Sequence, residues 1–198
     1  MSAVVERAAL PLALLTVAEP DRVFAWRDGH ALPVSRFLAD VHAVAASLPS
    51  ACYAVNLCED RYAFLVGFCA VVTRGQTNLL PPSRAVHAIE EVLAGHPGSY
   101  ALGDAPRDGM SAHYVQIRLD AHAAAAASEV PQIDGEQIVA IGFTSGSTGQ
   151  PKANPKAWSS VQASSAHNTR TLGAALGLAP GDLAHVVATV PPQHMYGL

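Results

Sequence analysis

The sequence is poor in charge, and this narrows the kinds of partner that it can have. Asp, Glu, Lys and Arg make up 14% of its 198 residues, and the formal net charge is -4. A basic face that could neutralise a phosphate backbone is missing, so we expect no nucleic-acid partner. No stretch reaches the roughly 20 uncharged apolar residues of a membrane span, so we expect no membrane partner either.

Cysteine is also scarce. Cys52, Cys58 and Cys69 are odd in number, and two of them stand in apolar stretches, where a thiol behaves as a small hydrophobic side chain. Neither Cys-x-x-Cys nor His-Glu-x-x-His occurs, so we predict no metal site. The apolar run at 8–18 is interrupted early by Pro11 and does not favour export. We therefore expect a reducing, cytoplasmic setting.

Hydrophobic residues make up 50% of the sequence, enough for a sizeable buried core, and their spacing alternates between strand and helix patterns. We expect strands at Val23–Trp26, Leu32–Val34, Tyr53–Cys58, Thr77–Leu80, Tyr100–Gly103, Tyr114–Leu119, Gln137–Phe143 and Ala184–Val190. We expect helices from a Ser35 N-cap to about Ser47, from Glu59-Asp60 to just before Gly75, from Ala85 to Ala94 with Ser83 as cap, and from about Lys156 to Leu176.

Strand and helix alternate along the chain, which predicts parallel pairing. The fold class is therefore α/β, a βαβ-rich and mostly parallel sheet flanked by helices. An alanine-rich stretch, Ala121–Ser128, is followed by Pro131 and Gly135 and is the best linker candidate. We predict an α/β segment at 1–120, a linker-like loop at 121–136, and a strand, loop, helix and strand at 137–198.

One loop carries most of the functional information. Residues 144–152 read Thr-Ser-Gly-Ser-Thr-Gly-Gln-Pro-Lys and follow an apolar strand. Glycines allow the backbone to approach a bulky anion, hydroxyls add hydrogen-bond donors, and a lysine adds positive charge. The residues that we expect to hold a triphosphate are Thr144, Ser145, Gly146, Ser147, Thr148, Gly149 and Lys152.

Three better-known glycine motifs do not fit this loop. The Walker motif requires Gly-Lys-Ser/Thr, but Gly149 is followed by Gln150. The dinucleotide fingerprint requires glycine at position 144, which is threonine. The nucleophile elbow Gly-x-Ser-x-Gly is absent as well. By composition alone, a Ser/Thr/Gly cluster is most often a solvated loop.

The order of residues favours binding. Phe143 to Lys152 resembles, nearly position by position, the phosphate-binding signature of the adenylate-forming superfamily, whose members include acyl-CoA synthetases, aryl-acid ligases and adenylation domains. A second segment, Pro192 to Gly197, resembles the stretch that shapes the wall of the acyl pocket in that superfamily. By this resemblance, His194, Tyr196 and Gly197 belong to the substrate pocket, and the chain is the amino-terminal portion of the large domain.

One departure from the superfamily pattern and one ambiguity remain. Relatives place Gly after the signature lysine, whereas Ala153-Asn154-Pro155 stands here, so the exit of the loop is altered. Trp158 is placed to line the acid pocket, but core packing is the commoner role of a buried aromatic. His167 and His185 are interpreted as structural or surface residues.

The resemblance implies activation of an aryl or acyl carboxylic acid by ATP with Mg²⁺, giving an acyl-adenylate and pyrophosphate. A thiol, from coenzyme A or the pantetheine arm of an acyl carrier protein, then takes the acyl group in most relatives. The adenine-binding loop, the ribose-binding acid and the catalytic lysine of relatives have no counterpart before Leu198, so we expect little turnover by this chain alone. The alternatives are a non-catalytic nucleotide- or acyl-binding module and a structural module with a vestigial loop.

Overall fold

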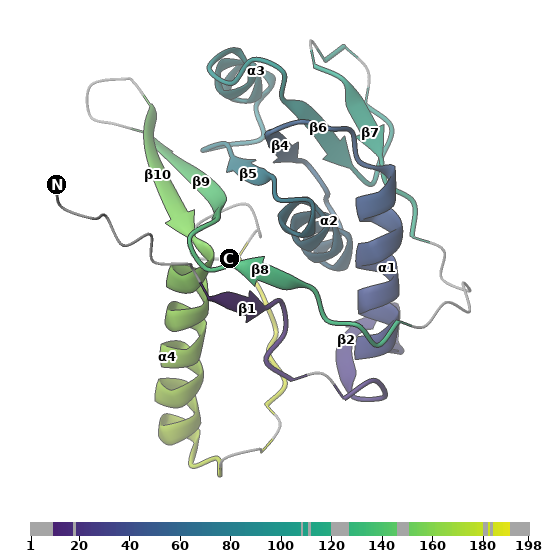
Figure 1. The fold of residues 1–198 in the computed structure, drawn as a ribbon, viewed down its shortest axis with the longest axis vertical. Coiled ribbons are helices and arrows are strands. Elements are labelled where there is room, and N and C mark those ends of the chain that lie inside the picture. The colour runs from purple at the N-terminus through teal and green to yellow at the C-terminus, as the bar shows by residue number, and fades with distance from the viewer. Residues whose placement is uncertain are drawn as a thin grey trace, which may run out of the picture.

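The computed structural model describes residues 10–17, 19–107, 109–110, 112–119, 127–145, 151–179, 182 and 184–190. Figure 1 shows the arrangement of their helices and strands. In chain order these are β1 (Pro11–Ala13), β2 (Val23–Arg27), β3 (His30–Pro33), α1 (Val34–Ser47), β4 (Tyr53–Asn56), α2 (Arg61–Thr73), β5 (Thr77–Leu80), α3 (Val86–Ala94), β6 (Tyr100–Gly103), β7 (Tyr114–Gln116), β8 (Gln132–Asp134), β9 (Ile138–Ser145), β10 (Pro151–Ala157) and α4 (Trp158–Leu176).

The main sheet has six strands in the order β10-β9-β5-β4-β6-β7. The central pairs β9–β5, β5–β4, β4–β6 and β6–β7 are parallel, and the β9–β10 pair is antiparallel. The expected α/β class with a mostly parallel sheet is confirmed. The first two predicted strands, β2 and β3, pair as a hairpin in a separate two-stranded sheet, which turns at Asp28 and Gly29, both with positive φ.

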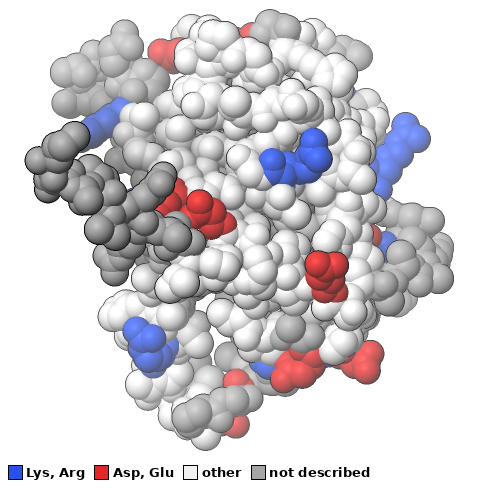
Figure 2. Space-filling model, viewed as in Figure 1, with Lys and Arg blue, Asp and Glu red and all other residues white. Residues whose placement is uncertain are grey.

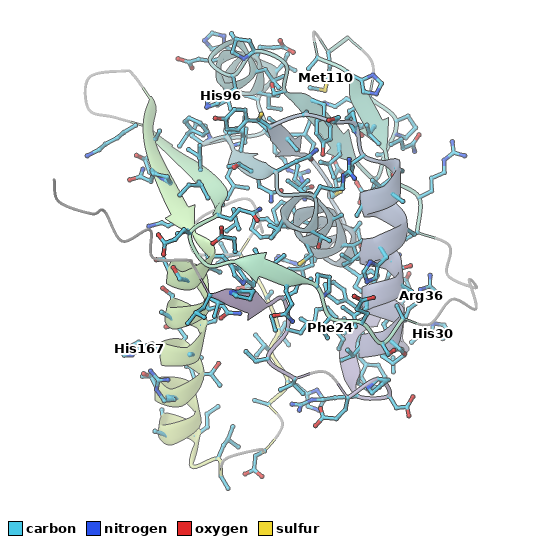
Figure 3. All side chains as sticks on the ribbon, in the orientation of Figure 1. Phe24, His30, Arg36, His96, Met110 and His167 are labelled. Atoms are coloured by element: carbon cyan, nitrogen blue, oxygen red, sulfur yellow. The ribbon has the colours of Figure 1, made fainter. Side chains whose placement is uncertain are left out.

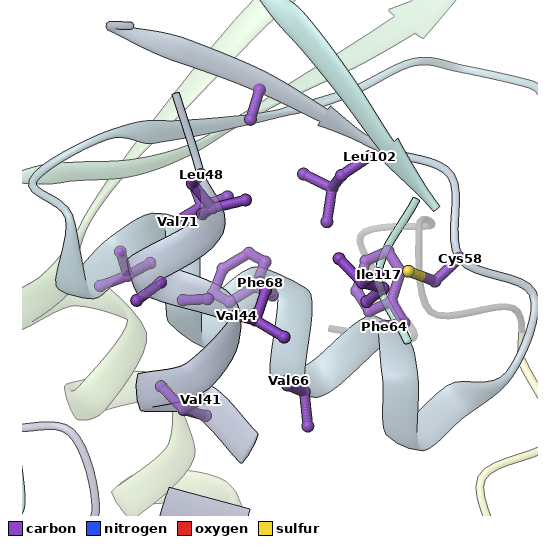
Figure 4. Close-up of a cluster of buried hydrophobic side chains, with 14 of the residues drawn as sticks. Val41, Val44, Leu48, Cys58, Phe64, Val66, Phe68, Val71, Leu102 and Ile117 are labelled. Atoms are coloured by element: carbon purple, nitrogen blue, oxygen red, sulfur yellow. The ribbon is translucent and has the colours of Figure 1, made fainter. Parts of the chain in front are cut away.

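Helices cover both faces of the sheet, as a parallel sheet requires. Side chains from α1 and α2 form one apolar cluster with the sheet, and side chains from α3 form another on the opposite face. Figure 4 shows part of the first cluster, in which side chains from α1 and α2 meet Leu102 and Ile117. The nearly all-apolar α2 lies between α1, the sheet and β8, so it is covered on more than one side, as a helix without a polar face requires.

Two predicted N-caps are wrong. Helix α1 begins at Val34, and its first amides donate to backbone carbonyls, Val34 to Arg22 at 2.8 Å and Ser35 to Pro20 at 2.9 Å. These carbonyls of the preceding turn take the place of a Ser35 hydroxyl cap. Helix α3 begins at Val86 with Ala85 as its N-cap. The Ser83 hydroxyl accepts from the Ala85 amide, which precedes the first residue of the helix, so Ser83 does not cap it.

The carboxyl-terminal part of the chain also differs from expectation. Residues 151–157 form β10, so the last helix begins at Trp158 and not near Lys156. Two prolines in this stretch argue against a central strand but are tolerated in β10, which is an edge strand and leaves one side of its backbone unpaired. The strand expected at Ala184–Val190 is absent: these residues pair with no described strand, and Val186 and Val187 are 82% and 86% exposed.

The segment between β7 and β9 contains a short strand that the sequence did not predict. β8 lies within the stretch expected to be linker-like and pairs antiparallel with β1, Leu12 lying opposite Ile133. β7 ends at Gln116, before the predicted end at Leu119. The division into segments at 1–120, 121–136 and 137–198 stays a prediction. Among the described residues, no helix is long and apolar enough to cross a membrane.

A buried polar contact joins α1 to α2. Arg36 Nε donates to both carboxylate oxygens of Asp40 at 3.0 Å, and the Tyr62 hydroxyl donates to Asp40 Oδ2 at 2.7 Å. Asp40 is only 7% exposed. In such surroundings a carboxylate requires its partners, and the partners in turn depend on it.

We expect Asp40→Ala to lower the free energy of unfolding by about 3 kcal/mol, the usual cost of removing one member of a buried ion pair. Urea unfolding followed by circular dichroism measures this change. The exposed Asp21 is the matched control, and Asp21→Ala should leave the midpoint nearly unchanged. Equal effects of the two substitutions would contradict a structural role for the Asp40 contact.

Candidate functional site

The carboxyl ends of the parallel strands define one edge of the sheet, which we call the carboxyl edge. In doubly wound α/β proteins, ligands bind at this edge, beside loops that follow the strands. Here those loops follow β4, β5, β6 and β9. The candidate site is therefore built from these loops and the helix ends beside them.

The amino end of α2 lies at the carboxyl edge, and carboxylates of the chain already occupy it. Asp60 is the N-cap and accepts from the Ala63 amide at 2.8 Å. Asp104, which follows β6, accepts from the amides of Glu59 and Asp60 at 2.9 and 2.8 Å. These amides and the helix dipole are thus neutralised by acids, so this helix end does not offer a site for a phosphate.

Arg84, which follows β5, is also engaged within the protein. Its guanidinium donates to the carbonyls of Leu57, at 3.3 Å, and Cys58, and pairs with Glu59 at 3.4 Å. The side chain therefore ties the loop after β5 to the loop after β4. Because the guanidinium is already paired, Arg84 is not free to bind an anion.

Cys58 follows β4 but lacks the character of a nucleophile. Its side chain is fully buried, and burial raises the pKa of the thiol far above its usual range, an effect strengthened by the negative charge of Asp104. Because the thiolate is the reactive form, Cys58 stays a neutral thiol at physiological pH. It packs in the apolar cluster with Phe64 and Ile117, as Figure 4 shows.

The loop expected to bind phosphate joins β9 to β10. The sequence suggested a strand, a loop and a helix, but the structure has a β-hairpin, with Thr144 opposite Lys152 and Ser145 opposite Pro151. Directly opposite residues in an antiparallel pair place their side chains on the same face. The structure therefore brings Thr144 and Lys152, both exposed, to one face at the base of the loop.

The tip of the hairpin lies outside the described residues. Of the predicted phosphate-binding residues, Gly146, Ser147, Thr148 and Gly149 fall there, and the description of Ser145 is limited to its backbone in β9. Their role stays a prediction.

Asn154 holds the base of the hairpin. Its side-chain amide donates to the Lys152 carbonyl at 3.0 Å and, more weakly, to the Gly142 carbonyl at 3.5 Å across the pair. Asn154 belongs to the stretch that departs from the superfamily signature. In this chain the altered exit is a strand that an asparagine side chain fastens to its neighbour, a role that the sequence pattern did not reveal.

Positive charge is rare enough for Lys152 to matter. Lys152 and Lys156 are the two lysines of the sequence, and both lie on β10. Within the described part of the chain, no carboxylate forms an ion pair with either. Figure 2 shows that charged residues are widely scattered on the face in view. An exposed, unneutralised ammonium beside a hydroxyl can bind an anion.

The part of the chain just before the predicted acyl-pocket segment, Pro192 to Gly197, also lies at the carboxyl edge. Arg61, the first residue of α2, donates to the Val190 carbonyl at 2.5 Å. Val190 therefore lies beside the amino end of α2. The predicted pocket residues His194, Tyr196 and Gly197 come after it in the chain and lie outside the described residues.

Trp158 lies away from this edge. It begins α4, and its amide donates at 2.9 Å to the carbonyl of Gln137, which precedes β9 at the opposite edge of the sheet. The side chain is 7% exposed and packs in the same cluster as α1 and α2. Of the two interpretations that the sequence left open, this geometry favours core packing, and a pocket role stays a prediction.

A large hollow in the described surface lies away from this edge. Its volume is about 780 Å³, and it is bounded by the second half of α4, Arg22, residues 178–179, Asp182 and residues 184–186. It does not reach the β9–β10 hairpin. Among the described residues, no cluster of His, Cys, Asp and Glu could hold a metal ion.

Comparisons with known proteins relate the fold to one group of enzymes. No protein-family model and no curated protein matches the sequence. Solved structures do match. o-Succinylbenzoate CoA synthetase from Bacillus subtilis, in complex with its acyl-adenylate intermediate, has a TM-score of 0.63 at 19% identity over 90% of this chain and 48% of that one. ATP-bound MatB from Rhodopseudomonas palustris has a TM-score of 0.63 at 22% identity over 85% of this chain and 37% of that one.

The NpsA N-terminal subdomain from Klebsiella oxytoca, in complex with 3-hydroxybenzoyl-AMSN, has a TM-score of 0.56 at 22% identity over 70% of this chain. It too is matched over 37% of its length, so the chain spans less than half of the structures that it resembles. At these identities the likeness shows the fold, which is that of the N-terminal portion of adenylate-forming enzymes.

We expect Cys58 to be inert in the folded chain. At about pH 8, a disulfide reagent should react rapidly with the exposed Cys52 and reach Cys58 only after unfolding. Burial raises the pKa of the Cys69 thiol to about 12, so Cys69 should also be slow. Absorbance of the released thiol measures the rates. Cys52→Ser should abolish the rapid phase, and a rapid phase that persists would show that Cys58 or Cys69 is accessible.

Proposed function

We propose that this chain is the amino-terminal part of an adenylate-forming ligase, and that its β9–β10 hairpin binds the β- and γ-phosphates of ATP. The observation that carries the proposal is the juxtaposition of Thr144 and Lys152 on one face, where a Ser/Thr/Gly loop begins and ends. The fold, shared with ATP-dependent ligases, supports the same assignment.

The surroundings support this hairpin over other places at the carboxyl edge. Asp60 and Asp104 occupy the amino end of α2, and Glu59 neutralises Arg84. An anion there would meet carboxylates. At the hairpin it would meet the ammonium of Lys152, the Thr144 hydroxyl and loop amides, which are donors that suit phosphate oxygens.

In the proposed reaction, a carboxylate oxygen of the substrate forms a bond to the α-phosphorus of ATP. The bond from that phosphorus to the oxygen bridging to the β-phosphate breaks, and pyrophosphate leaves with its electron pair. The hairpin residues contribute by orienting the leaving group and by neutralising its growing negative charge, which is how most catalysis of phosphoryl-type transfer is achieved. The product is an acyl-adenylate.

The described residues fit Mg²⁺ only as an ion that arrives with the nucleotide. They contain no group of His, Cys, Asp and Glu that could hold a metal, so the ligands for Mg²⁺ would be phosphate oxygens. The ion would supply charge neutralisation at the leaving phosphates. Lys152 would add to this from the protein side.

The substrate is proposed as a carboxylic acid, aryl or acyl, without a narrower choice. Among the matched structures, one is an o-succinylbenzoate CoA synthetase and another holds a 3-hydroxybenzoyl compound, so proteins with this fold bind different acyl groups. Transfer to a thiol of coenzyme A or of a carrier protein completes the proposal for the whole protein. The setting proposed is cytoplasmic. A non-catalytic module that binds a nucleotide is the competing proposal.

Binding of ATP tests the hairpin directly. We expect titration calorimetry with ATP and Mg²⁺ to detect binding to this chain, and Lys152→Ala to weaken it by about tenfold or more, the effect of losing one charged hydrogen bond. Lys156→Ala removes the same charge from the same strand and should have a much smaller effect. Equal losses would indicate a general charge effect, and no binding by the unsubstituted chain would support a vestigial loop.

Turnover separates the enzyme from the binding module. We expect a longer natural chain containing this sequence to exchange pyrophosphate into ATP when supplied with its acid from a panel of aryl and acyl acids. The present chain alone should exchange at or near background, because it spans under half of the matched structures. Robust exchange by this chain would contradict that expectation, and failure of the longer chain with every acid would favour a module without chemistry.

A further inference from the structure

The β9–β10 hairpin extends past the rest of the sheet. The pairing of β9 with β5 runs from Ala140 to Gly142, opposite Asn78 to Leu80, and ends there. β9 continues to Ser145 with β10 as its neighbour, and β10 is the edge strand. The part of the hairpin that carries Thr144 and Lys152 is therefore held by a single described strand pair, and its direction depends on side-chain packing.

Among the side chains of β9 that the structure describes, Phe143 is the last that packs inward. It is partly buried against the cluster on the α3 face, whereas Thr144, the next residue, is exposed. Its cross-strand neighbour is Ala153, which is small and exposed and contributes little packing. Whatever holds the Phe143 ring therefore sets the angle at which the hairpin leaves the sheet.

His96 holds that ring. The imidazole and Phe143 rings are edge to face, with centroids 5.6 Å apart and planes at 80°. His96 also meets the Tyr53 ring of β4 edge to face, with centroids 5.0 Å apart. β5 lies between β4 and β9 in the sheet, so His96 bridges across one strand to connect the two on either side of it.

The imidazole is itself fixed to α3. Its Nδ1–H donates to the carbonyl of Val92, one turn earlier, at 2.8 Å, which determines the ring orientation at the end of this helix. Figure 3 labels His96 on the part of the molecule where α3 and the β9–β10 hairpin lie. Two ring contacts and a hydrogen bond restrict the movement of this side chain.

We propose that His96 is a positioning residue for the nucleotide: by packing between Tyr53 and Phe143 it orients the β9–β10 hairpin, and thereby Thr144 and Lys152, for phosphate binding. This rests on the proposed function of the hairpin. His96 makes no contact with the nucleotide in this proposal and acts through Phe143.

Amide hydrogen exchange on this chain tests the positioning without any ligand. His96→Ala should speed exchange at residues 143–145 and 152–154 by several-fold, while β4, β5 and α2 keep their protection. His96→Phe retains a ring between Tyr53 and Phe143 and should restore slow exchange. His87, which is exposed on α3, provides the control, and His87→Ala should change nothing.

Exchange that is unchanged in His96→Ala would overturn the proposal. So would a uniform increase over α3, β4 and β5, because that outcome indicates general packing and not orientation of the hairpin.

Calorimetry with ATP and Mg²⁺ tests the consequence for binding. His96→Ala should weaken ATP binding by about three- to tenfold with little change in the midpoint of thermal unfolding. His96→Phe should bind ATP as tightly as the unsubstituted chain does. His87→Ala should leave the ATP affinity unchanged. Unaltered affinity in His96→Ala, or loss of affinity that Phe fails to restore, would overturn the nucleotide role of His96. If the unsubstituted chain binds no ATP, the proposed function fails with that role, and the exchange result decides separately whether His96 orients the hairpin.

Discussion

The structure depends above all on the burial of α2. This helix is apolar around most of its circumference, so it is stable only where α1, the parallel strands and β8 enclose it. Its direction is set at its first turn, where Asp60 caps the helix and Asp104 accepts the two preceding amides. Because α2 must run back beneath the sheet from this end, the strands on either side of it are parallel and share one carboxyl edge.

The acids at the amino end of α2 also determine where along the carboxyl edge an anion can bind. The acids that stabilise the amino end of α2 exclude a phosphate from it, and the pairing of Arg84 with Glu59 removes another cation. In a protein with so few charged residues, Lys152 is then the described cation best placed to meet an anion beside a hydroxyl. Acids already pair with the helix amides and with Arg84 near the centre of the sheet, so the proposed phosphate site lies at the β9–β10 end of the carboxyl edge.

That position also explains why packing around Phe143 matters. A loop at the centre of the edge would be held by strands on both sides, but β9 outruns β5 and is supported by β10 alone. The contacts of His96 with Tyr53 and Phe143, and of Asn154 with Lys152, provide the remaining order at the base of the hairpin. His96 and Asn154 lie outside the recognisable signature, Phe143 to Lys152. The geometry of the hairpin therefore depends on residues that are not part of the motif.

The sequence by itself determined the alternation of strand and helix and the parallel pairing of the central strands, because local periodicity carries this information. The tertiary structure decided the features that depend on distant partners. Pro151–Ala157 became a strand only because β9 offered an edge that tolerates proline, and Val34 needed no serine cap because carbonyls of 20–22 met its helix amides. His96 drew its importance from two rings, 43 residues before it and 47 after, that no sequence pattern places beside it. Such contacts arise from packing between elements far apart in the chain, which local propensity does not encode.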